Sequence, residues 1–306
     1  MNFVFLLKTY TDARIRKISK ERIQAELDKR NIIIVAGFQG INSFGDVTTL
    51  GRGGSDTSAV ALAAAFHADL CQIYTDVDGV YTADPRVVPN AKKLPEITFA
   101  DMLELASQSA QVLHNRSVEL AKKYHVNMEV VSSLKNIPGT KVKEVIKLEK
   151  TNIGGVAKMD NFVRFSLVGL EDRPGVAFKV FSLLSRNSVN VDIILQSVGR
   201  GGSKDISFTC PLSSLDDARR VLEENKDMLE YDSIEVDDNV AKISLVGAGM
   251  MTHVGVASDM FEALYDAGIN IQMIATSEIR ISVLVNKDDA NRAIKVVHDK
   301  FSGNED

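Results

Sequence analysis

The stretch Thr48-Thr-Leu-Gly-Arg-Gly-Gly-Ser-Asp-Thr57 leads into an alanine-rich helix, which we expect over about residues 56–68. Its glycines let the backbone approach a ligand closely and adopt positive φ. The N-terminus of the helix favours an anion, because its free N–H groups and dipole point there. Arg52 adds a planar fork that suits a carboxylate or a phosphate. The alternative is a flexible loop with a good helix cap at Ser55 or Asp56; the arginine inside the loop favours an anion site.

The segments on either side of this loop alternate between strands and helices. Near-continuous apolar runs predict buried strands at residues 31–37, 71–75 and 128–132. Helical patterns separate these runs. Strands that alternate with helices are typical of an α/β layered domain with a largely parallel sheet, and we expect this domain to occupy residues 1–150.

A second polar stretch, Tyr74-Thr-Asp-Val-Asp-Gly-Val-Tyr-Thr-Ala-Asp-Pro-Arg86, follows the strand expected at 71–75. Ligands bind outside the carboxyl ends of strands in open α/β sheets. Arg86 suits a polyphosphate, Tyr81 a nucleotide base or sugar, and Asp76 and Asp78 are suited to holding Mg²⁺ through water. An ordinary turn is the alternative, since Asp-Gly and Asp-Pro are turn formers.

The C-terminal half contains an internal repeat with an offset of roughly 80 residues. Val163-Arg-Phe-Ser-Leu-Val-Gly169 matches Ala241-Lys-Ile-Ser-Leu-Val-Gly247, and Gly175-Val-Ala177 matches Gly255-Val-Ala257. Two copies with so long a period predict a duplicated small α+β module. We place the copies at residues 151–238 and 239–306.

Composition narrows the classes of function. The net charge of -5 argues against a nucleic-acid or anionic-membrane partner. Cys71 and Cys210 are far apart in apolar contexts, which indicates buried thiols in a reducing compartment. No apolar run reaches the ~18–20 residues that span a bilayer. We therefore expect a cytoplasmic protein.

The polar stretches resemble, in order, the signatures of aspartokinases. The resemblance is carried by Val35-Ala-Gly-Phe-Gln-Gly40, by the two stretches above, by Arg116-Ser-Val-Glu-Leu-Ala-Lys122 and by the repeat, which resembles paired ACT domains. It implies an amino-acid-kinase-type layered sheet domain followed by two ferredoxin-like (βαββαβ) ACT modules. It also implies ATP-dependent phosphorylation of L-aspartate with Mg²⁺, the entry to lysine, threonine, methionine and diaminopimelate.

The resemblance also assigns residues to the kinase reaction. All of them bind substrate or nucleotide, and none is assigned as a direct ligand of a metal. The aspartate site would be formed by Arg52, Gly53, Gly54, Ser55 and Asp56. The ATP site would be formed by Thr75, Asp76, Tyr81, Asp84, Arg86, Gln111 and Val112. Because the nucleophile is the substrate's carboxylate, His114 and His125 are interpreted as packing or surface residues.

Effector binding is implied for the ACT modules, with lysine and threonine as feedback amino acids and a homodimer or heteromer as the assembly. The residues expected to bind the effector are Asp172, Arg173, Gly175, Asn190, Asp192, Gln196, Ser277 and Glu278. The alternative is that these loops and strand ends are simply polar.

Two departures from the family pattern are visible. The Lys-Phe-Gly-Gly segment that opens the family's kinase domain does not occur, so we expect a kinase domain lacking its N-terminal part. In addition, Ser109, Gln111 and Asn115 stand where the family has glycine, lysine and proline. A catalytically impaired chain that senses amino acids is therefore kept as an alternative, as is, less favoured, another amino-acid kinase.

Overall fold

The structure is a computed structural model, and it describes residues 4–6, 10–11, 13–107, 112–144, 154–197, 199, 201–247, 250 and 254–302. The chain divides into two compact units. Unit 1 comprises residues 1–157 and 246–254, and unit 2 comprises residues 158–245 and 255–306. No helix among the described residues is long and apolar enough to cross a membrane.

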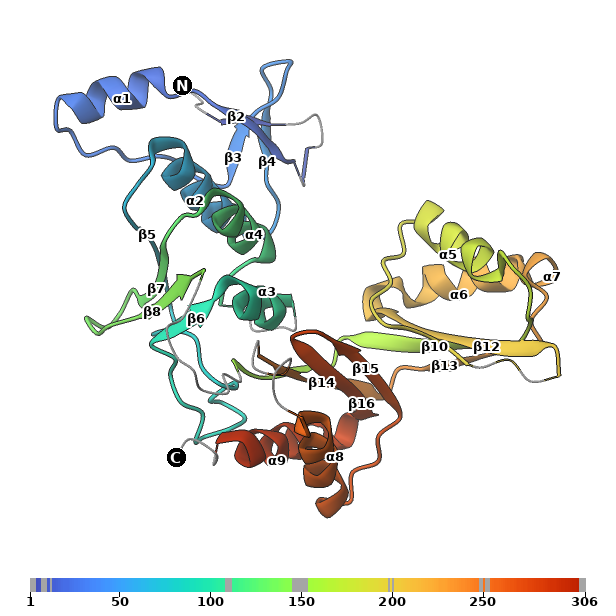
Figure 1. The fold of residues 1–306 in the computed structure, drawn as a ribbon. Coiled ribbons are helices and arrows are strands. Elements are labelled where there is room, and N and C mark those ends of the chain that lie inside the picture. The colour runs from blue at the N-terminus through green and yellow to red at the C-terminus, as the bar shows by residue number, and fades with distance from the viewer. Residues whose placement is uncertain are drawn as a thin grey trace. The chain divides into compact units, whose positions relative to one another are not determined.

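Unit 1 begins with a small mixed sheet and one helix. The strand order is β2-β1-β3-β4, and β1 is parallel to β3 but antiparallel to β2. The elements are β1 (Val4–Leu6), β2 (Ile15–Ile18), α1 (Glu21–Asp28), β3 (Gln39–Ile41) and β4 (Val47–Thr49). The β3–β4 hairpin delivers the chain directly to the glycine-rich loop (Figure 1).

The second sheet of unit 1 has the strand order β5-β7-β8-β6. Its strands are β5 (Cys71–Thr75), β6 (Glu96–Thr98), β7 (Met128–Ser132) and β8 (Thr140–Lys143), and its helices are α2 (Gly54–Phe66), α3 (Phe99–Ser107) and α4 (Asn115–Tyr124). Alternate residues of β5 and β7, such as Ile73 and Val130, enter a core with these helices. Pairs β5–β7 and β6–β8 are parallel, whereas β7–β8 is antiparallel.

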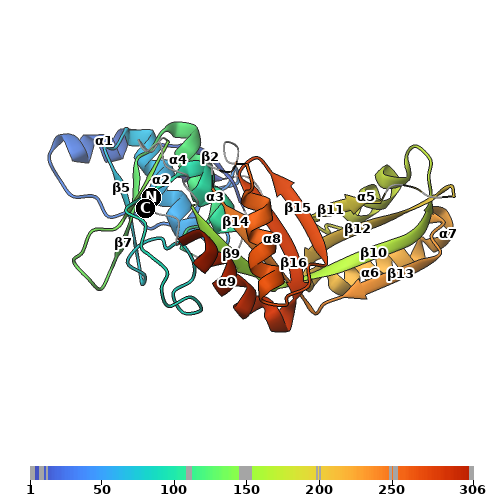
Figure 2. The ribbon, with the colours of Figure 1, turned by 60° about the horizontal axis from the view of Figure 1, so that its bottom comes forward.

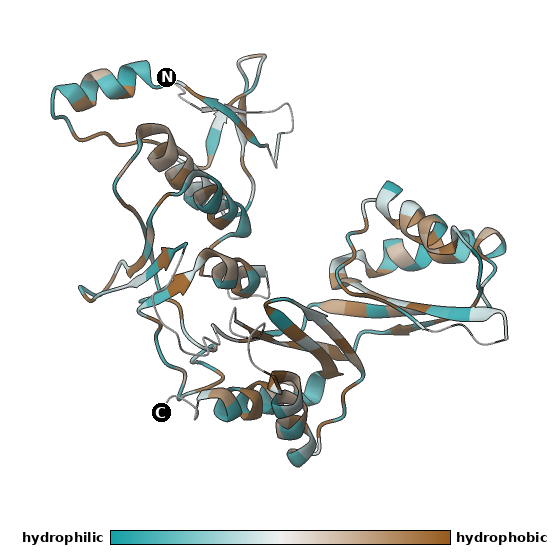
Figure 3. Ribbon diagram, in the orientation of Figure 1, coloured by the Kyte–Doolittle hydropathy of each residue, from teal (hydrophilic) through white to brown (hydrophobic). Residues whose placement is uncertain are grey.

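The buried strand expected at residues 31–37 does not form. These residues lie outside any strand or helix, and Ile32 and Ile34 are each 95% exposed. The ribbon that follows α1 is coloured largely brown in Figure 3, which marks the hydrophobic residues of this segment. A strand forms only where its backbone groups find partners, and no described strand pairs with this segment. The apolar run alone therefore did not specify the strand.

The first module of unit 2 is a four-stranded antiparallel sheet with helices on one face. Its strand order is β11-β12-β10-β13. The elements are β10 (Phe162–Glu171), α5 (Val176–Arg186), β11 (Ile194–Gln196), β12 (Ser203–Pro211), η1 (Leu212–Ser214), α6 (Leu215–Glu224), α7 (Lys226–Leu229) and β13 (Ser233–Asp237). Phe165 stacks on Phe208 at 5.4 Å, and Phe181 of α5 meets Phe208 edge-on.

The second module repeats this pattern with one difference. Its elements are β14 (Val240–Val246), α8 (Val256–Asp266), β15 (Met273–Ser277), β16 (Arg280–Asn286), η3 (Lys287–Asp289) and α9 (Ala290–Ser302), and Figure 2 shows α8 and α9 beside the sheet. The strand order is β15-β16-β14-β9. Strand β9 (Gly155–Met159) precedes the first module in sequence, so the first module is inserted between two strands of the second module's sheet.

Cys71 and Cys210 are buried free thiols, as their apolar contexts indicated. Burial raises the pKa of each thiol to about 11. For Cys71 the nearby Asp56 adds to this effect. Neither side chain is therefore a thiolate near neutral pH.

An apolar cluster and an ion pair join the two modules. Ile193 packs with Val240, Met273 and other residues of the second module. Next to it, the Lys242 ammonium of β14 is bonded to the carboxylate of Asp192. The Lys242 side chain is only 2% exposed, whereas that of Asp192 is 43% exposed. A buried ammonium depends on its acceptor because it has lost its water.

We predict that Asp192→Ala lowers the free energy of unfolding of unit 2 by about 1–3 kcal/mol, because it leaves the Lys242 ammonium without this acceptor. Replacing the ammonium as well, in Asp192→Ala/Lys242→Met, should recover most of the loss. Denaturant unfolding of both variants checks this, with Glu224→Ala in an exposed pair on α6 as control. A double variant as unstable as the single one would show that the ammonium is not responsible.

Candidate functional site

The glycine-rich loop between β4 and α2 depends on backbone that only glycine adopts freely. Gly51 and Gly53 have φ of 78° and 68°. A Cβ on Gly54 would lie 2.8 Å from the side chain of Leu50. Gly53 is the N-cap of α2 and has no side-chain oxygen to offer to the first amides of the helix. The N-terminus of α2 therefore retains N–H groups for an anion.

The loop rests on the beginning of α4. A Cβ on Gly53 would lie 2.3 Å from the side chain of His114. His114 is the N-cap of α4, where its Nδ1 accepts from the Arg116 amide at 3.4 Å. The Arg116 guanidinium donates to the carbonyl oxygens of Leu50 (2.7 Å) and Ala13 (2.9 Å). His114 is thus a packing and capping residue.

Arg52 and Ser55 are exposed in this loop, and Asp56 is half-buried. Within the described part of the chain, no carboxylate or other acceptor contacts Arg52. Burial raises the pKa of Asp56, although the His114 backbone amide and the Ser55 hydroxyl bond to its carboxylate. The loop therefore presents a cation, helix amides and a half-buried carboxylate together, which fits a ligand carrying both an acid and an ammonium group.

The stretch from Tyr74 to Arg86 is an ordered turn that follows β5. The Val80 amide donates to the Thr140 hydroxyl at 2.8 Å, and Gly79 is needed because a Cβ there would lie 2.6 Å from the same oxygen. The Thr82 amide donates to the carbonyl of Lys92 at 2.9 Å. These bonds hold the turn at the carboxyl end of the strand.

The charged side chains of this turn contact one another. Arg86 donates to both carboxylate oxygens of Asp84, at 3.0 Å through Nε and 2.8 Å through Nη2. The Tyr81 hydroxyl donates to Asp78 at 2.9 Å, which lowers the pKa of Asp78 and raises that of Tyr81. The side chain of Arg86 is 88% exposed, so its guanidinium remains open to a second anion.

Of the remaining residues expected at the ATP site, the structure describes Thr75, Asp76 and Val112. The Thr75 hydroxyl donates to the exposed carboxylate of Asp76 at 3.1 Å. Val112 is half-buried and packs against the core of unit 1, and Gln111 lies outside the described residues. The structure thus seats the Arg52 loop on α4 and the Arg86 turn on β8. The two groups therefore rest on different elements of unit 1.

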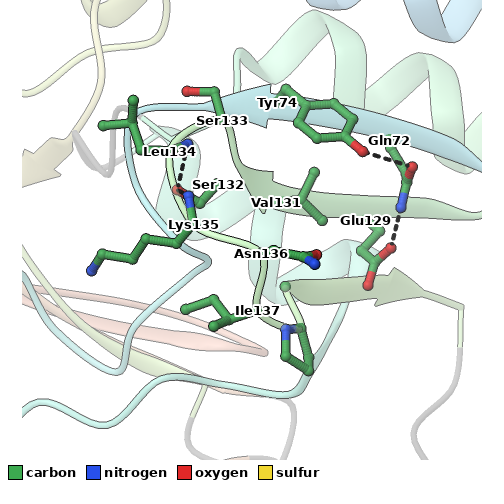
Figure 4. Close-up of a pocket in the computed structure, with 12 residues that line it drawn as sticks. Gln72, Tyr74, Glu129, Val131, Ser132, Ser133, Leu134, Lys135, Asn136 and Ile137 are labelled. Carbon is green, nitrogen blue, oxygen red and sulfur yellow. Dashed lines mark hydrogen bonds between the residues drawn. The ribbon is translucent and has the colours of Figure 1, made fainter.

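A hollow of about 590 Å³ adjoins the Arg86 turn (Figure 4). Its floor is the side of β5 and β7 that faces away from the core, with Gln72, Tyr74 and Glu129 linked by hydrogen bonds. Its rim is the segment 132–139, which bonds to β5 through the Ser133 amide and the Thr75 carbonyl at 2.8 Å. The sequence did not predict this hollow.

In the first module of unit 2, the residues expected to bind an effector have internal partners. Asp172 pairs with Lys204 at 3.0 Å, and the Lys204 side chain is only 10% exposed. Arg173 pairs with Glu171 at 3.0 Å and also with Glu230. Gly175 begins α5 with φ of 93°. Asp172 is therefore an ion-paired carboxylate before any ligand binds.

The other expected effector residues lie in three places. Asp192 is bonded to Lys242 at the junction of the modules, and Asn190 is exposed two residues earlier. Gln196 is exposed at the end of the edge strand β11. Ser277 pairs with Arg280 at the tip of the β15–β16 hairpin, and Glu278 is exposed in its turn.

Comparison with known proteins identifies the family. The model of the amino acid kinase family matches residues 2–132, and models of the ACT domain match residues 166–228 and 243–301. The chain is 47% identical over 304 residues to the aspartokinase of Corynebacterium efficiens, a match that covers 97% of the chain and 72% of that protein. The chain belongs to the aspartokinase family. Aspartate phosphorylation is the reaction of that family.

Further relatives agree with this assignment. An aspartate kinase of Pseudomonas putida is 46% identical over 96% of the chain and 72% of its own length. Among solved structures, the Clostridium acetobutylicum aspartate kinase matches with a TM-score of 0.83 and 28% identity, over 98% of the chain and 69% of that protein. Escherichia coli aspartokinase III in complex with aspartate and ADP matches with a TM-score of 0.82 and 28% identity, over 98% and 68%.

We predict that Gly53→Ala destabilises unit 1 more than Gly45→Ala does. Both residues have positive φ, of 68° and 86°, but nothing lies within 4 Å of a Cβ on Gly45. Both variants carry the backbone cost of about 1 kcal/mol or more, and only Gly53→Ala adds the collision with His114. Denaturant unfolding gives the difference. Equal losses would show that the loop does not rest on His114.

We also predict that Asp56→Asn raises the thermal midpoint at pH 7. A raised pKa means that the folded chain holds this proton more tightly than the unfolded chain, so the ionised carboxylate opposes folding as pH rises through that pKa. The advantage of asparagine should shrink as pH falls toward the ordinary carboxyl range. Thermal scans across pH check this, with the exposed Asp69→Asn as control. A rise in the thermal midpoint that is the same at every pH would contradict a raised pKa of Asp56 as its cause.

Proposed function

We propose that this chain transfers the γ-phosphate of ATP to the side-chain carboxylate of L-aspartate. The observation that carries the proposal is Arg52, a cation without a described partner beside the N-terminus of α2. Arg52 would bind a carboxylate of aspartate, and Gly53, Gly54 and Ser55 would line the same site beside it. The carboxylate of Asp56 would accept the α-ammonium. The aspartate and ADP complex of the E. coli relative supports both ligands.

The nucleotide is proposed to bind at the turn after β5. Arg86 would contact the phosphates while Asp84 holds its guanidinium in orientation, and Tyr81 would pack beside the base or sugar. Thr75 and Asp76 stand at the end of β5, where ligands of such sheets bind. Gln111 and Val112 would complete this site. The family and the local geometry together support these proposed side-chain roles.

Mg²⁺ fits this arrangement as a nucleotide-bound ion. Mg²⁺ is usually held by one or two carboxylates together with substrate phosphates, and within the described residues no group of three possible ligands forms a cage. Asp76 is an exposed carboxylate at the turn, and Asp78 lies two residues on. These carboxylates would hold the ion through water, and when bound it would neutralise phosphate charge.

The reaction needs no general base from the protein. The attacking group is an ionised carboxylate oxygen of aspartate, which forms a bond to the γ-phosphorus while the bond to the ADP oxygen breaks. No proton must be removed from the nucleophile. The protein's contribution is to orient the two substrates and to neutralise charge. Arg52 and Arg86 are the cations that would do so.

Unit 2 is proposed to bind feedback amino acids. The E. coli aspartokinase III structure in complex with lysine and aspartate also matches this chain, with a TM-score of 0.75. Lysine or threonine would bind at the loop around Asp172 to Gly175 and at the seam around Asn190 and Asp192. Gln196, Ser277 and Glu278 are the further candidates. Modules of this kind would also join chains into a homodimer or heteromer.

The assay is formation of aspartyl hydroxamate from ATP and L-aspartate by the purified chain, with calorimetry for each ligand. Arg52→Ala should weaken aspartate binding by roughly 10–100-fold, the value of a charge-assisted pair, and leave ATP binding unchanged. Arg86→Ala should do the reverse. The exposed Arg16→Ala serves as control.

Each outcome has a clear meaning. Aspartate-dependent turnover that fails with Arg52→Ala supports the proposal. Binding of lysine or threonine without binding of ATP or aspartate would instead identify an amino-acid-sensing regulatory chain. Turnover with glutamate in place of aspartate would mark another amino-acid kinase.

A further inference from the structure

We propose that Arg116 is a positioning residue for aspartate binding. Its guanidinium fixes the backbone from which the loop carrying Arg52 departs, and it does so without touching the substrate. The expected effect on affinity rests on the proposed function. The hydrogen bonds from Arg116 to the backbone, which we call the clamp, are present in the ligand-free chain.

The geometry of the clamp involves two segments far apart in sequence. Nη1 of Arg116 donates to the Leu50 carbonyl at 2.7 Å, and Nη2 donates to the Ala13 carbonyl at 2.9 Å. Leu50 and Ala13 are fully buried. Their segments are joined by a bond from the Ala13 amide to the Thr49 carbonyl at 3.0 Å. One planar group therefore ties both segments to the first turn of α4.

The position of the Leu50 carbonyl gives the clamp its importance. Leu50 is the last residue before Gly51, where the chain leaves β4 and enters the loop. The other end of the loop is tied by Ser58 of α2, whose hydroxyl donates to the Gly54 carbonyl at 2.7 Å and accepts from the Phe38 amide at 3.0 Å. Arg52 projects from the short backbone held between these two points.

The electrostatics of α4 supports a specific role for this arginine. A cation in the first turn of a helix is disfavoured by the helix dipole. Here the guanidinium is only partly exposed, so the unfavourable position is offset by charge-assisted bonds to two carbonyl oxygens. A rigid fork is required to bind two acceptors at fixed angles, whereas a lysine ammonium is a point charge on a flexible stem.

The consequence for binding is selective. A displaced loop would move Arg52 and the amides of α2 away from an aspartate carboxylate, and small displacements of binding groups are costly. The Arg86 turn has its own ties to Thr140 and Lys92. Loss of the clamp should therefore weaken aspartate binding and leave ATP binding unchanged.

The test is Arg116→Lys in the full chain, with Lys122→Gln, exposed on the same helix, as the matched control. The Kd for L-aspartate should rise about tenfold, the loss of one charge-assisted bond, while the Kd for ATP stays unchanged. Equal weakening of both ligands would overturn the proposal in favour of a general structural role. An unchanged Kd for aspartate would also overturn it.

Hydrogen exchange of the ligand-free chain separates this inference from the proposed function. The amides of Leu50, Gly54 and Thr57 are hydrogen-bonded to Phe38, Gly51 and Gly53. In Arg116→Lys, exchange in a peptide covering residues 50–57 should quicken about tenfold, with peptides of α9 unchanged. If the parent chain fails to bind aspartate, the proposed function is wrong. Hydrogen exchange of residues 50–57 still shows whether Arg116 holds the loop. Unchanged exchange would overturn this role of Arg116.

Discussion

The seating of the glycine-rich loop on the start of α4 is the interaction on which the candidate kinase site depends. It brings together Ala13, residues 48–58 and residues 114–116, which are distant in sequence. Gly53 allows the contact because it has no Cβ to collide with His114. Arg116 fixes its geometry through hydrogen bonds to two backbone carbonyl oxygens. The N–H groups at the N-terminus of α2 can point at a bound anion in a fixed direction only while the loop stays packed on α4.

The charged groups of the chain divide into those with internal partners and those left open. Lys242 and Lys204 are nearly buried and are paired with Asp192 and Asp172. These pairs organise the ACT modules, and an effector's ammonium would compete for carboxylates already in use. Arg52, by contrast, has no acceptor among the described residues. An exposed cation on a constrained loop is the arrangement expected where a ligand supplies the partner.

Much of the fold could be predicted from short-range pattern. Buried apolar residues alternate along β5, and short matching motifs mark the two modules. Both patterns can be read from short stretches of sequence, and the structure contains both. The strand expected at residues 31–37 failed because its formation depends on a pairing partner that apolar content does not encode. The position of β9 in the second module's sheet was equally invisible, since it arises from pairing with β14 across the whole first module.

The candidate site shows the same division. The residue types of the Arg52 loop and the Arg86 turn indicated anion binding from sequence alone. Gly51 and Gly53 have the positive φ expected there, whereas the close approach at Gly53 is to the side chain of His114. The pairing of Arg86 with Asp84 is local, two residues apart, yet the sequence suggested only that both face a nucleotide. Arg116 stood within a recognised motif, but its role was not visible because both of its carbonyl partners are backbone atoms.

The most direct test of this account is a double-mutant cycle between Gly53→Ala and His114→Gly, measured by denaturant unfolding. If the loop rests on His114, removal of that side chain relieves the collision, and the cost of Gly53→Ala falls to that of its backbone conformation alone, about 1 kcal/mol. The account predicts this coupling. A cost of Gly53→Ala that is the same with and without the His114 side chain would contradict it.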